Sequence, residues 1–305
     1  MPDTAIAIFH SARRAACDER AFMLAAVGIA SMIRFDGLQF LLEVDAPDAE
    51  RATTQLAQYE LERRPAGPRP PPPPTYPFAW VGCIVYVVTL VAIGLMVSNG
   101  LWRLDAFDIG ALDAGRVQRG QWWRAWTALT LHLDGAHLAA NLAAGVWFCY
   151  LAAAQIGSGS AWLLIVTGAA CANLLEALLG PPTHLSVGAS TAVFTALGLL
   201  AAHSWRLRSS YTQRWAVRWA PLVAGVVLLG WFGSGGGSGD GGEDFNGFQQ
   251  IDIVAHAAGF LVGAMLGALA AQPWARQGLE RVPQWLSGLA ALASIALAWA
   301  LALAS

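Results

Sequence analysis

The sequence predicts an all-α polytopic membrane protein that is preceded by a small soluble α+β domain. Of its 305 residues, 56% are hydrophobic and 12% are charged, whereas soluble domains carry about 25% charged residues. A chain with so few charges cannot cover a surface that faces water, so much of it must face lipid. The charges are also concentrated at the start, because residues 1–76 hold 8 of the 18 basic and 10 of the 20 acidic residues.

Residues 1–64 make up the predicted soluble domain. Their pattern indicates a strand at 4–10, a helix at 12–27, strands at 29–35 and 38–44, and a helix at 47–64. Asp36-Gly37, between the two later strands, is a strong signal for a β-hairpin. Residues 65–77 include five consecutive prolines at 70–74, which predicts a stiff polyproline linker rather than part of a core.

Seven apolar segments follow the linker, and a transmembrane helix needs about 20 residues. The segments lie at 78–97, 136–154, 161–179, 188–203, 215–232, 251–271 and 284–304. The first six are expected to form a membrane core over residues 78–271, in which the fourth helix is short. Residues 272–305 add a loop and a seventh transmembrane helix.

Basic residues in the connecting loops indicate the orientation. The loops after the fourth and sixth segments are basic, with Arg206, Arg208, Arg214, Arg218, Arg276 and Arg281. The loop between the fifth and sixth segments has no Lys or Arg but holds Asp240, Glu243 and Asp244. With seven spans, the N-terminal domain is expected in the cytosol and the C-terminus outside. Arginines in the first external loop favour the opposite orientation, but that loop is long and also holds three aspartates.

Composition also argues against several partners and cofactors. The net charge of −2 is unlike that of a nucleic-acid-binding protein. The four cysteines, Cys17, Cys83, Cys149 and Cys171, show no spacing typical of a metal site. Three of them lie in apolar runs, where Cys packs as a small hydrophobic residue. We therefore expect neither a metal nor another cofactor.

Polar residues at membrane depth are energetically expensive and call for an explanation. His132, His137 and Asn141 lie at the second segment, and the last two are four residues apart and so share one helix face. A single His or Asn in a membrane often only bonds a neighbouring helix. Two on one face favour a polar site inside the bundle.

A serine and a histidine lie in the fourth and sixth segments. Ser190 follows Gly188-Ala189 at the start of the fourth segment, where alone it would be interpreted as a helix cap. His256 lies in the sixth and is followed by Gly259, Gly263 and Gly267, a small-residue stripe that lets another helix approach closely. Both residues are within about two turns of the outer ends of their segments and hence at similar depth.

Together these groups are the side chains that a hydrolytic site requires. A serine and a histidine can supply a nucleophile and a general base. His137 and Asn141 are candidate donors to an oxyanion, and backbone N–H groups at the start of the fourth helix are further candidates.

The motifs, taken in order, resemble those of the rhomboid family of intramembrane serine proteases. The resemblance rests on Trp123-Arg124 in the first loop, on His132, His137 and Asn141, on Gly188-Ala189-Ser190-Thr191 as a GxSx motif, and on His256 followed by Gly259. It covers about residues 78–271 and implies a six-helix core, with the seventh helix and the cytosolic domain as additions seen in bacterial members.

The resemblance implies a function and a role for each residue. Ser190 would attack the scissile carbonyl and His256 would act as the base, while His137, Asn141 and the backbone at Ser190 would bind the oxyanion. Gly188, Ala189 and His132 would support this site, and Trp123-Arg124 would seat the first loop in the outer leaflet. Substrates would be single-span proteins cleaved within the lipid bilayer of the inner cell membrane, near its outer face.

Two alternatives remain open at this stage. An inactive rhomboid-like protein would bind client helices without cleaving them, although such a protein is expected to lack the Ser or the His. A transporter usually shows internal repeats or paired broken helices, which we do not detect. The sequence does not indicate an oligomeric state.

Three residues depart from the family's usual pattern. Thr191 stands where Gly is commoner, and Phe194 stands where a Tyr often stacks on the catalytic His. Gln155 lies near the end of the second segment, where a Glu is often found. Thr191 is expected to narrow the pocket, and Phe194 to stack on the histidine without a tyrosine's hydroxyl. Gln155 is expected to weaken an interhelical anchor.

Overall fold

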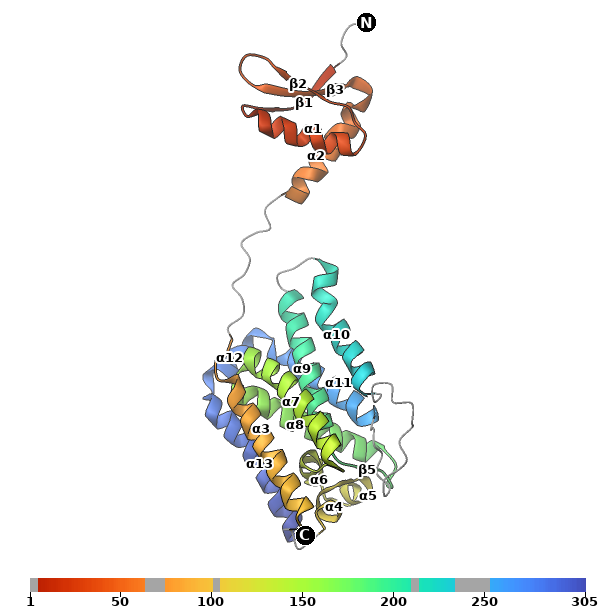
Figure 1. The fold of residues 1–305 in the computed structure, drawn as a ribbon, viewed down its shortest axis with the longest axis vertical. Helices are drawn as coiled ribbons and strands as arrows, with labels where there is room; N and C mark the ends of the chain where they lie inside the picture. The colour runs from red at the N-terminus through yellow and green to blue at the C-terminus, as the bar shows by residue number, and fades with distance from the viewer. Residues whose placement is uncertain (1–4, 64–74, 101–104, 210–213, 234–252) are drawn as a thin grey trace. The chain divides into compact units, whose positions relative to one another are not determined.

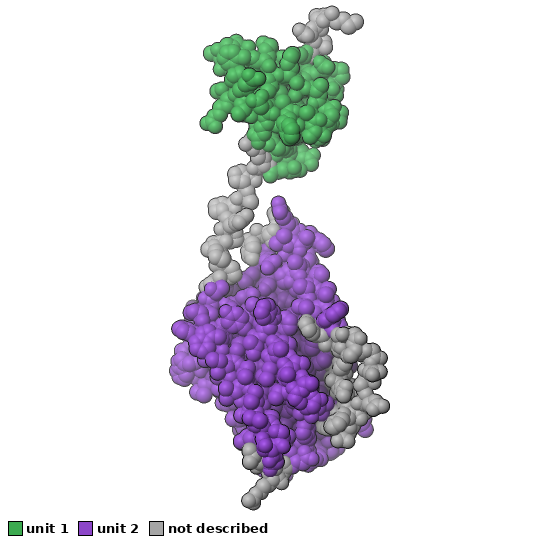
Figure 2. Space-filling model, viewed as in Figure 1, with its two compact units in different colours: residues 1–70 green, residues 71–305 purple. Residues whose placement is uncertain are grey.

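The computed structural model describes residues 5–63, 75–100, 105–209, 214–233 and 253–305. The chain forms two compact units, residues 1–70 and 71–305, coloured separately in Figure 2. The proline run at 70–74, the acidic residues Asp240, Glu243 and Asp244, and the start of the predicted sixth segment at 251–252 lie outside the described residues.

The first unit is a two-layer α+β domain with the predicted order of elements. It contains β1 (Ala5–Ser11), α1 (Arg14–Ala26), β2 (Met32–Phe35), β3 (Phe40–Asp45), a 3-10 turn at Ala46–Asp48, and α2 (Ala49–Arg63). The sheet is antiparallel with order β1-β3-β2, and both helices cover the same face (Figure 1). Cys17, Leu24, Leu42 and Leu56 form part of the core between the layers.

The predicted hairpin forms because a side chain in its turn accepts hydrogen bonds from the backbone N–H groups of the turn. One carboxylate oxygen of Asp36 accepts hydrogen bonds from the backbone N–H groups of Leu38 and Gln39, both at 2.8 Å. Gly37 has φ +98°, a left-handed conformation that costs glycine little. Short polar side chains that bond the following backbone are typical of such turns.

The second unit is a helical bundle with one long helix for each predicted segment. These helices are α3 (Ala79–Ser98), α7 (Gly135–Ile156), α8 (Ser158–Leu179), α9 (Ser190–Ser209), α10 (Trp215–Gly233), α11 (Ile253–Ala270) and α13 (Gln284–Ala304). Within the described residues, five of them are long and apolar enough to cross a membrane, namely α3, α7, α8, α11 and α13. The chain is therefore a polytopic helical membrane protein.

Helix α9 is the centre of the bundle. It packs against α7, α8, α10 and α11 (Figure 1), and residues 191–199 are all buried. A helix that is buried all round does not need the long apolar surface of a lipid-facing span. The apolar segment predicted at 188–203 is short, and α9 is not among the helices apolar enough to span a membrane, but the helix itself has 20 residues and continues to Ser209. Arg206 and Arg208 lie in its last turn, where basic residues stabilise a helix end.

Glycines allow α11 to lie directly against the backbone of α9. A Cβ atom added at Gly259, Gly263 or Gly267 would lie 2.7, 2.1 or 2.2 Å from the carbonyl oxygens of Thr191, Thr195 and Leu199, respectively. In return, a Cβ at Gly198 of α9 would lie 2.0 Å from the Phe260 carbonyl oxygen. No larger residue fits at these points without moving a backbone.

The connection between α3 and α7 is folded rather than extended. It contains α4 (Ala106–Gly110), β4 (Leu112–Asp113), α5 (Ala114–Gln118), α6 (Arg124–Thr127) and a 3-10 turn at Ala128–Thr130. Strand β4 pairs antiparallel with β5 (Leu185–Ser186), just before α9. A further helix, α12 (Pro273–Arg281), precedes α13.

Replacing a glycine in the α9–α11 contact should destabilise the bundle. Gly263→Leu would force the two backbones apart, and we expect it to lower the free energy of unfolding by about 3 kcal/mol. Gly278→Leu is the matched control, because Gly278 is exposed in α12 and a Cβ there meets nothing within 4 Å. SDS-induced unfolding in mixed micelles measures both. Wild-type stability of Gly263→Leu would contradict this close packing.

Candidate active site

Ser190 begins α9, and the segment before it is held in an unusual backbone conformation. Helical hydrogen bonding starts where the Val193 N–H donates to the Ala189 carbonyl at 3.0 Å. Gly188 has φ +131°, which a residue with a Cβ rarely adopts, and its N–H donates to the Ala128 carbonyl at 3.0 Å. Gly188 therefore turns the chain so that Ser190 becomes the first residue of a buried helix.

His137 lies beside this turn. A Cβ at Gly188 would be 2.9 Å from His137 Nε2 and 3.7 Å from Ser190 Oγ. The His137 imidazole and the Ser190 hydroxyl therefore both lie close to the position that a Cβ of residue 188 would occupy. This space is free because residue 188 is a glycine. The structure brings Gly188, Ser190 and His137 together.

His132 supports the turn from the other side. Its Nε2 accepts a hydrogen bond from the Ala189 N–H at 3.4 Å, and its ring lies 5.2 Å from that of His137. His132 precedes α7 in the chain, and burial, followed by the neighbouring His137, lowers its pKa to about 4. The imidazole is therefore neutral at pH 7, the state in which Nε2 can accept that bond.

Helix α7 is positioned by two residues that the motif analysis missed. The Asp134 carboxylate caps its start by accepting from the His137 N–H at 2.7 Å. Asn141 is buried and donates its amide to the His137 carbonyl at 3.0 Å, while the Tyr86 hydroxyl of α3 donates to the Asn141 carbonyl at 2.9 Å. The sequence signals for these two residues are an Asp just before an apolar run, which indicates a helix cap, and a Tyr in the middle of a span, which indicates a polar contact between helices.

His256 is buried on the side of α11 that faces the start of α9. Its ring centroid lies 4.4 Å from that of Phe194, with the planes inclined by 35°. Phe194 is one helical turn after Ser190, so the two share a face of α9. Phe194 thus contacts His256 without the hydroxyl of a tyrosine.

Thr191 faces α11 at the same level. Its Cγ2 would lie 3.2 Å from a Cβ at Gly259, so its methyl group occupies part of the space between the helices. Near the opposite end of α9, the Ser204 hydroxyl donates to Gln155 Oε1 at 3.1 Å. An interhelical anchor between α7 and α9 therefore exists with Gln in place of Glu.

Arg124 lies inside the folded connection between α3 and α7. It is 2% exposed, and its guanidinium donates to Gln121 Oε1 at 2.6 Å and to the carbonyls of Ala111 and Asp108 at 2.8 Å each. Trp123 packs in a neighbouring apolar cluster with Leu131 and Trp299. The guanidinium of Arg124 thus bonds groups within the connection rather than lipid headgroups. If the loop lies at a lipid surface, Arg124 contributes by stabilising the folded loop.

A model of the rhomboid domain matches residues 119–301 of the chain. This range is more than half of the chain and runs from the folded connection through α9 and α11 into α13. The chain belongs to the rhomboid family. Among its described residues, no three His, Cys, Asp or Glu side chains are grouped to hold a metal ion.

Curated rhomboid proteins from several kingdoms are similar to parts of the chain. "Rhomboid protease GluP" of Bacillus subtilis is 31% identical over 42% of this chain and 24% of its own length. "Rhomboid-like protein 11, chloroplastic" of Arabidopsis thaliana is 30% identical over 48% of this chain and 51% of its own. "Rhomboid-like protease 3" of Toxoplasma gondii is 26% identical over 68% of this chain and 74% of its own. The chain thus spans about a quarter of the length of the first of these relatives and about half of the length of the second.

Replacing Arg124 by Lys should destabilise the folded connection. The single ammonium group of a lysine cannot reach the three acceptors that the planar Arg124 guanidinium bonds. We therefore expect the free energy of unfolding to fall by about 1.5–3 kcal/mol. Arg119→Lys is the control, because Arg119 is exposed in the same connection. The two variants can be compared by SDS-induced unfolding. Equal stability would show that the fork of hydrogen bonds contributes little.

Stability should fall in acid because His132 is buried as the neutral form. Its pKa is about 4 in the folded protein against an ordinary value of 6.5, so between these values the unfolded chain binds more protons. Stability is therefore lost as the pH falls from 6.5 to 4, and His132→Gln should flatten this slope. His10→Gln, at an exposed site in the first unit, should not. If stability depended on pH in His132→Gln as it does in the wild type, His132 would not be the buried neutral group responsible.

Proposed function

We propose that the protein is an intramembrane serine endopeptidase in which Ser190 is the nucleophile and His256 is the general base. The observation that carries the proposal is the approach of α11 to the first turns of α9. The His256 ring contacts Phe194, one turn beyond Ser190, and Gly259 lies against the Thr191 carbonyl. A serine and a buried histidine on adjacent faces of two tightly packed helices are the minimum for acyl transfer.

The proposed reaction has two steps. Ser190 Oγ attacks the scissile carbonyl carbon while His256 removes the hydroxyl proton, and the same proton then passes to the leaving amine as the peptide bond breaks. This leaves an ester between the substrate's carbonyl and Ser190. Water, deprotonated by His256, then hydrolyses the ester and regenerates the serine.

The oxyanion would be stabilised by donors around the Gly188 turn. The first N–H groups of a helix have no acceptor within the helix, and those of α9 begin at Ser190. His137 Nε2 lies near the same point as Ser190 Oγ, so it is the side-chain donor best placed for this role. Asn141 would act through its amide or by fixing the backbone at His137, whose carbonyl it bonds. Preorganised donors of this kind are often the largest contribution to catalysis.

The proposed substrates are single-span membrane proteins, cleaved in or near the transmembrane segment. A peptide bond in a helix must be released from its hydrogen bonds before Ser190 can reach it, which favours segments with small or helix-breaking residues. The arginines at the end of α9 and in α12 support a cytosolic N-terminus. In this orientation the site lies near the outer face of the inner cell membrane.

Removing either proposed catalytic group should abolish cleavage of a single-span reporter in liposomes. We expect Ser190→Ala and His256→Ala each to lower the rate at least about a thousandfold, as for other serine proteases. Ser294→Ala and His10→Ala are matched controls, since the Ser294 hydroxyl donates to the Ala291 carbonyl of its own helix α13 and His10 is exposed in the first unit. Cleavage by the wild type that persists in all variants would refute the proposal. A wild type that binds the reporter without cleaving it would instead indicate an inactive client-binding protein.

A further inference from the structure

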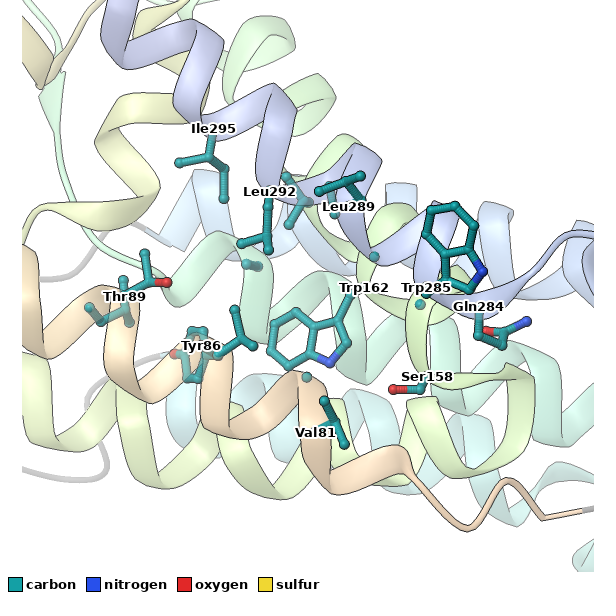
Figure 3. A pocket seen from close by; sticks show the side chains of 18 of the residues that line it. Val81, Tyr86, Thr89, Ser158, Trp162, Gln284, Trp285, Leu289, Leu292 and Ile295 are labelled. Carbon is teal, nitrogen blue, oxygen red and sulfur yellow. The ribbon is translucent and has the colours of Figure 1, made fainter.

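Two grooves among the described residues differ in what borders them. One lies between α3 and α13, as Figure 3 shows, and its lining includes Ala189, the residue before Ser190. That groove adjoins the proposed catalytic turn. The other, of about 630 Å³, lies in the first unit between strand β1 and helix α2. One of its walls is the edge of a β-sheet, which can form hydrogen bonds with a further strand.

Strand β1 is an unprotected edge of this sheet. The strand order is β1-β3-β2, so within the described residues one side of β1 has no neighbouring strand. Residues 5–9 include no charge and no proline, which commonly protect an exposed edge, and the ladder has one bulge, between Ala7 and Phe9. The opposite edge, β2, has only four residues, and its Arg34 pairs with Glu43 at 2.6 Å. The sheet can therefore be extended at β1 more readily than at β2.

The order of the elements leaves a place for one more strand beside β1. Strand β3 runs antiparallel to β1, and α2, which follows β3, packs on both strands. A strand after α2 would complete a β-α-β-β-α-β motif, and it would lie beside β1 and run antiparallel to it. The residues that follow α2 instead include prolines at 65, 68 and 70–74, which cannot donate hydrogen bonds to a neighbouring strand. Another chain is therefore the better source of this strand.

The groove beside this edge has apolar walls. Ile6 and Ile8 of β1 line one side, and Thr53, Thr54 and Ala57 of α2 line the other. Both threonine hydroxyls donate to carbonyls of their own helix, at 2.8 and 2.9 Å. Ile6 is 45% exposed, although it lies on the same side of the sheet as the helices. The groove therefore suits the apolar side chains of an added strand.

Charges near the two ends of β1 indicate which chain supplies the strand. Ala5 pairs with Asp45, which leads into α2, so Glu50 in the wall of the groove lies near the start of β1. Arg13 and Arg14 follow the other end of the strand and are exposed. The seven residues of β1 span about 20 Å. Among the described residues, neither Glu50 nor Arg13 forms an ion pair.

A second copy of β1 matches this pattern of charges. If it runs antiparallel to the first, its Arg13 arrives beside Glu50 of the first copy, and the same contact forms again by two-fold symmetry. A two-fold axis perpendicular to the sheet relates two identical strands only in the antiparallel direction, which is also the direction of the vacant place. Both the direction and the charges of β1 are thus self-complementary.

We propose that the first units of two copies of this chain pair through their β1 strands and form a symmetric dimer with a continuous sheet. Ile6 and Ile8 of each copy enter the shared groove, and Arg13 of each copy faces Glu50 of the other. This contact goes beyond the proposed protease activity and is independent of it, so it can be tested whether or not the protein cleaves a substrate.

Single-molecule photobleaching of the labelled full chain in liposomes tests the pairing. The wild type should form dimers, and Ile6→Lys should weaken dimerisation at least about tenfold, because a charge on the edge strand occurs twice in each dimer. Met32→Lys is the matched control, since Met32 is 60% exposed on the opposite edge strand β2, and it should dimerise like the wild type. A monomeric wild type would overturn the proposal. Undiminished dimerisation of Ile6→Lys would also overturn it, because the contact would then lie elsewhere.

A charge exchange tests the direction of the strands. Glu50→Arg and Arg13→Glu should each weaken the dimer about fivefold, because each contact occurs twice. The double variant should dimerise like the wild type, since opposite charges then meet again with their positions exchanged. A double variant weaker than either single variant would contradict antiparallel pairing.

Cysteine crosslinking locates the two-fold axis. When two identical strands pair antiparallel, one residue lies opposite itself. Cys171 is exposed and the other three cysteines are buried, so cysteines are placed singly at residues 5–9 in a Cys171→Ser background. One position should form a disulfide with its own copy more readily than its two neighbours do, and Met32→Cys should not crosslink. Equal crosslinking at all positions, or crosslinking at Met32→Cys alone, would contradict the pairing.

Discussion

The direct contact between the backbones of α9 and α11 is the constraint on which the rest of the molecule depends. Three glycines of α11, Gly259, Gly263 and Gly267, lie against carbonyl groups of α9 that are about one helical turn apart. In a membrane, where lipid tails are as apolar as side chains, such close packing is a main source of helix association. It also fixes the rotation of α11, because only one of its faces is free of side chains. His256 lies on that face, one turn before the first of these glycines.

A second set of interactions positions the start of α9. The folded connection pairs its β4 strand with β5, and Arg124 binds the connection's own carbonyls from within. The indole N–H of Trp299 in α13 donates to the Thr130 hydroxyl at 3.0 Å, close to His132. These contacts hold Gly188 in its left-handed conformation, so the serine is placed by long-range packing as well as by its own helix. Preorganisation of this kind is what a catalytic turn requires.

Much of the fold was predictable because the relevant signals are local. The seven apolar segments, the Asp36-Gly37 hairpin and the glycine stripe on α11 each follow from residue type and spacing. What could not be predicted depends on contacts between distant residues. Burial of Arg124 depends on how the connection between α3 and α7 folds around it, and the bond from Tyr86 to Asn141 depends on the packing of separate helices. The length of α9 was underestimated because His203 and Arg206 interrupt its apolar run, although the backbone remains helical to Ser209.

Labelling with a fluorophosphonate probe is the most direct test of the central claim that Ser190 is a nucleophile activated by His256. The probe reacts covalently with an activated serine, and peptide mass spectrometry identifies the modified residue. The account predicts that wild-type protein in liposomes is labelled at Ser190 and that His256→Ala loses this label while remaining folded. Labelling of another residue, or equal labelling of Ser190 without His256, would contradict it.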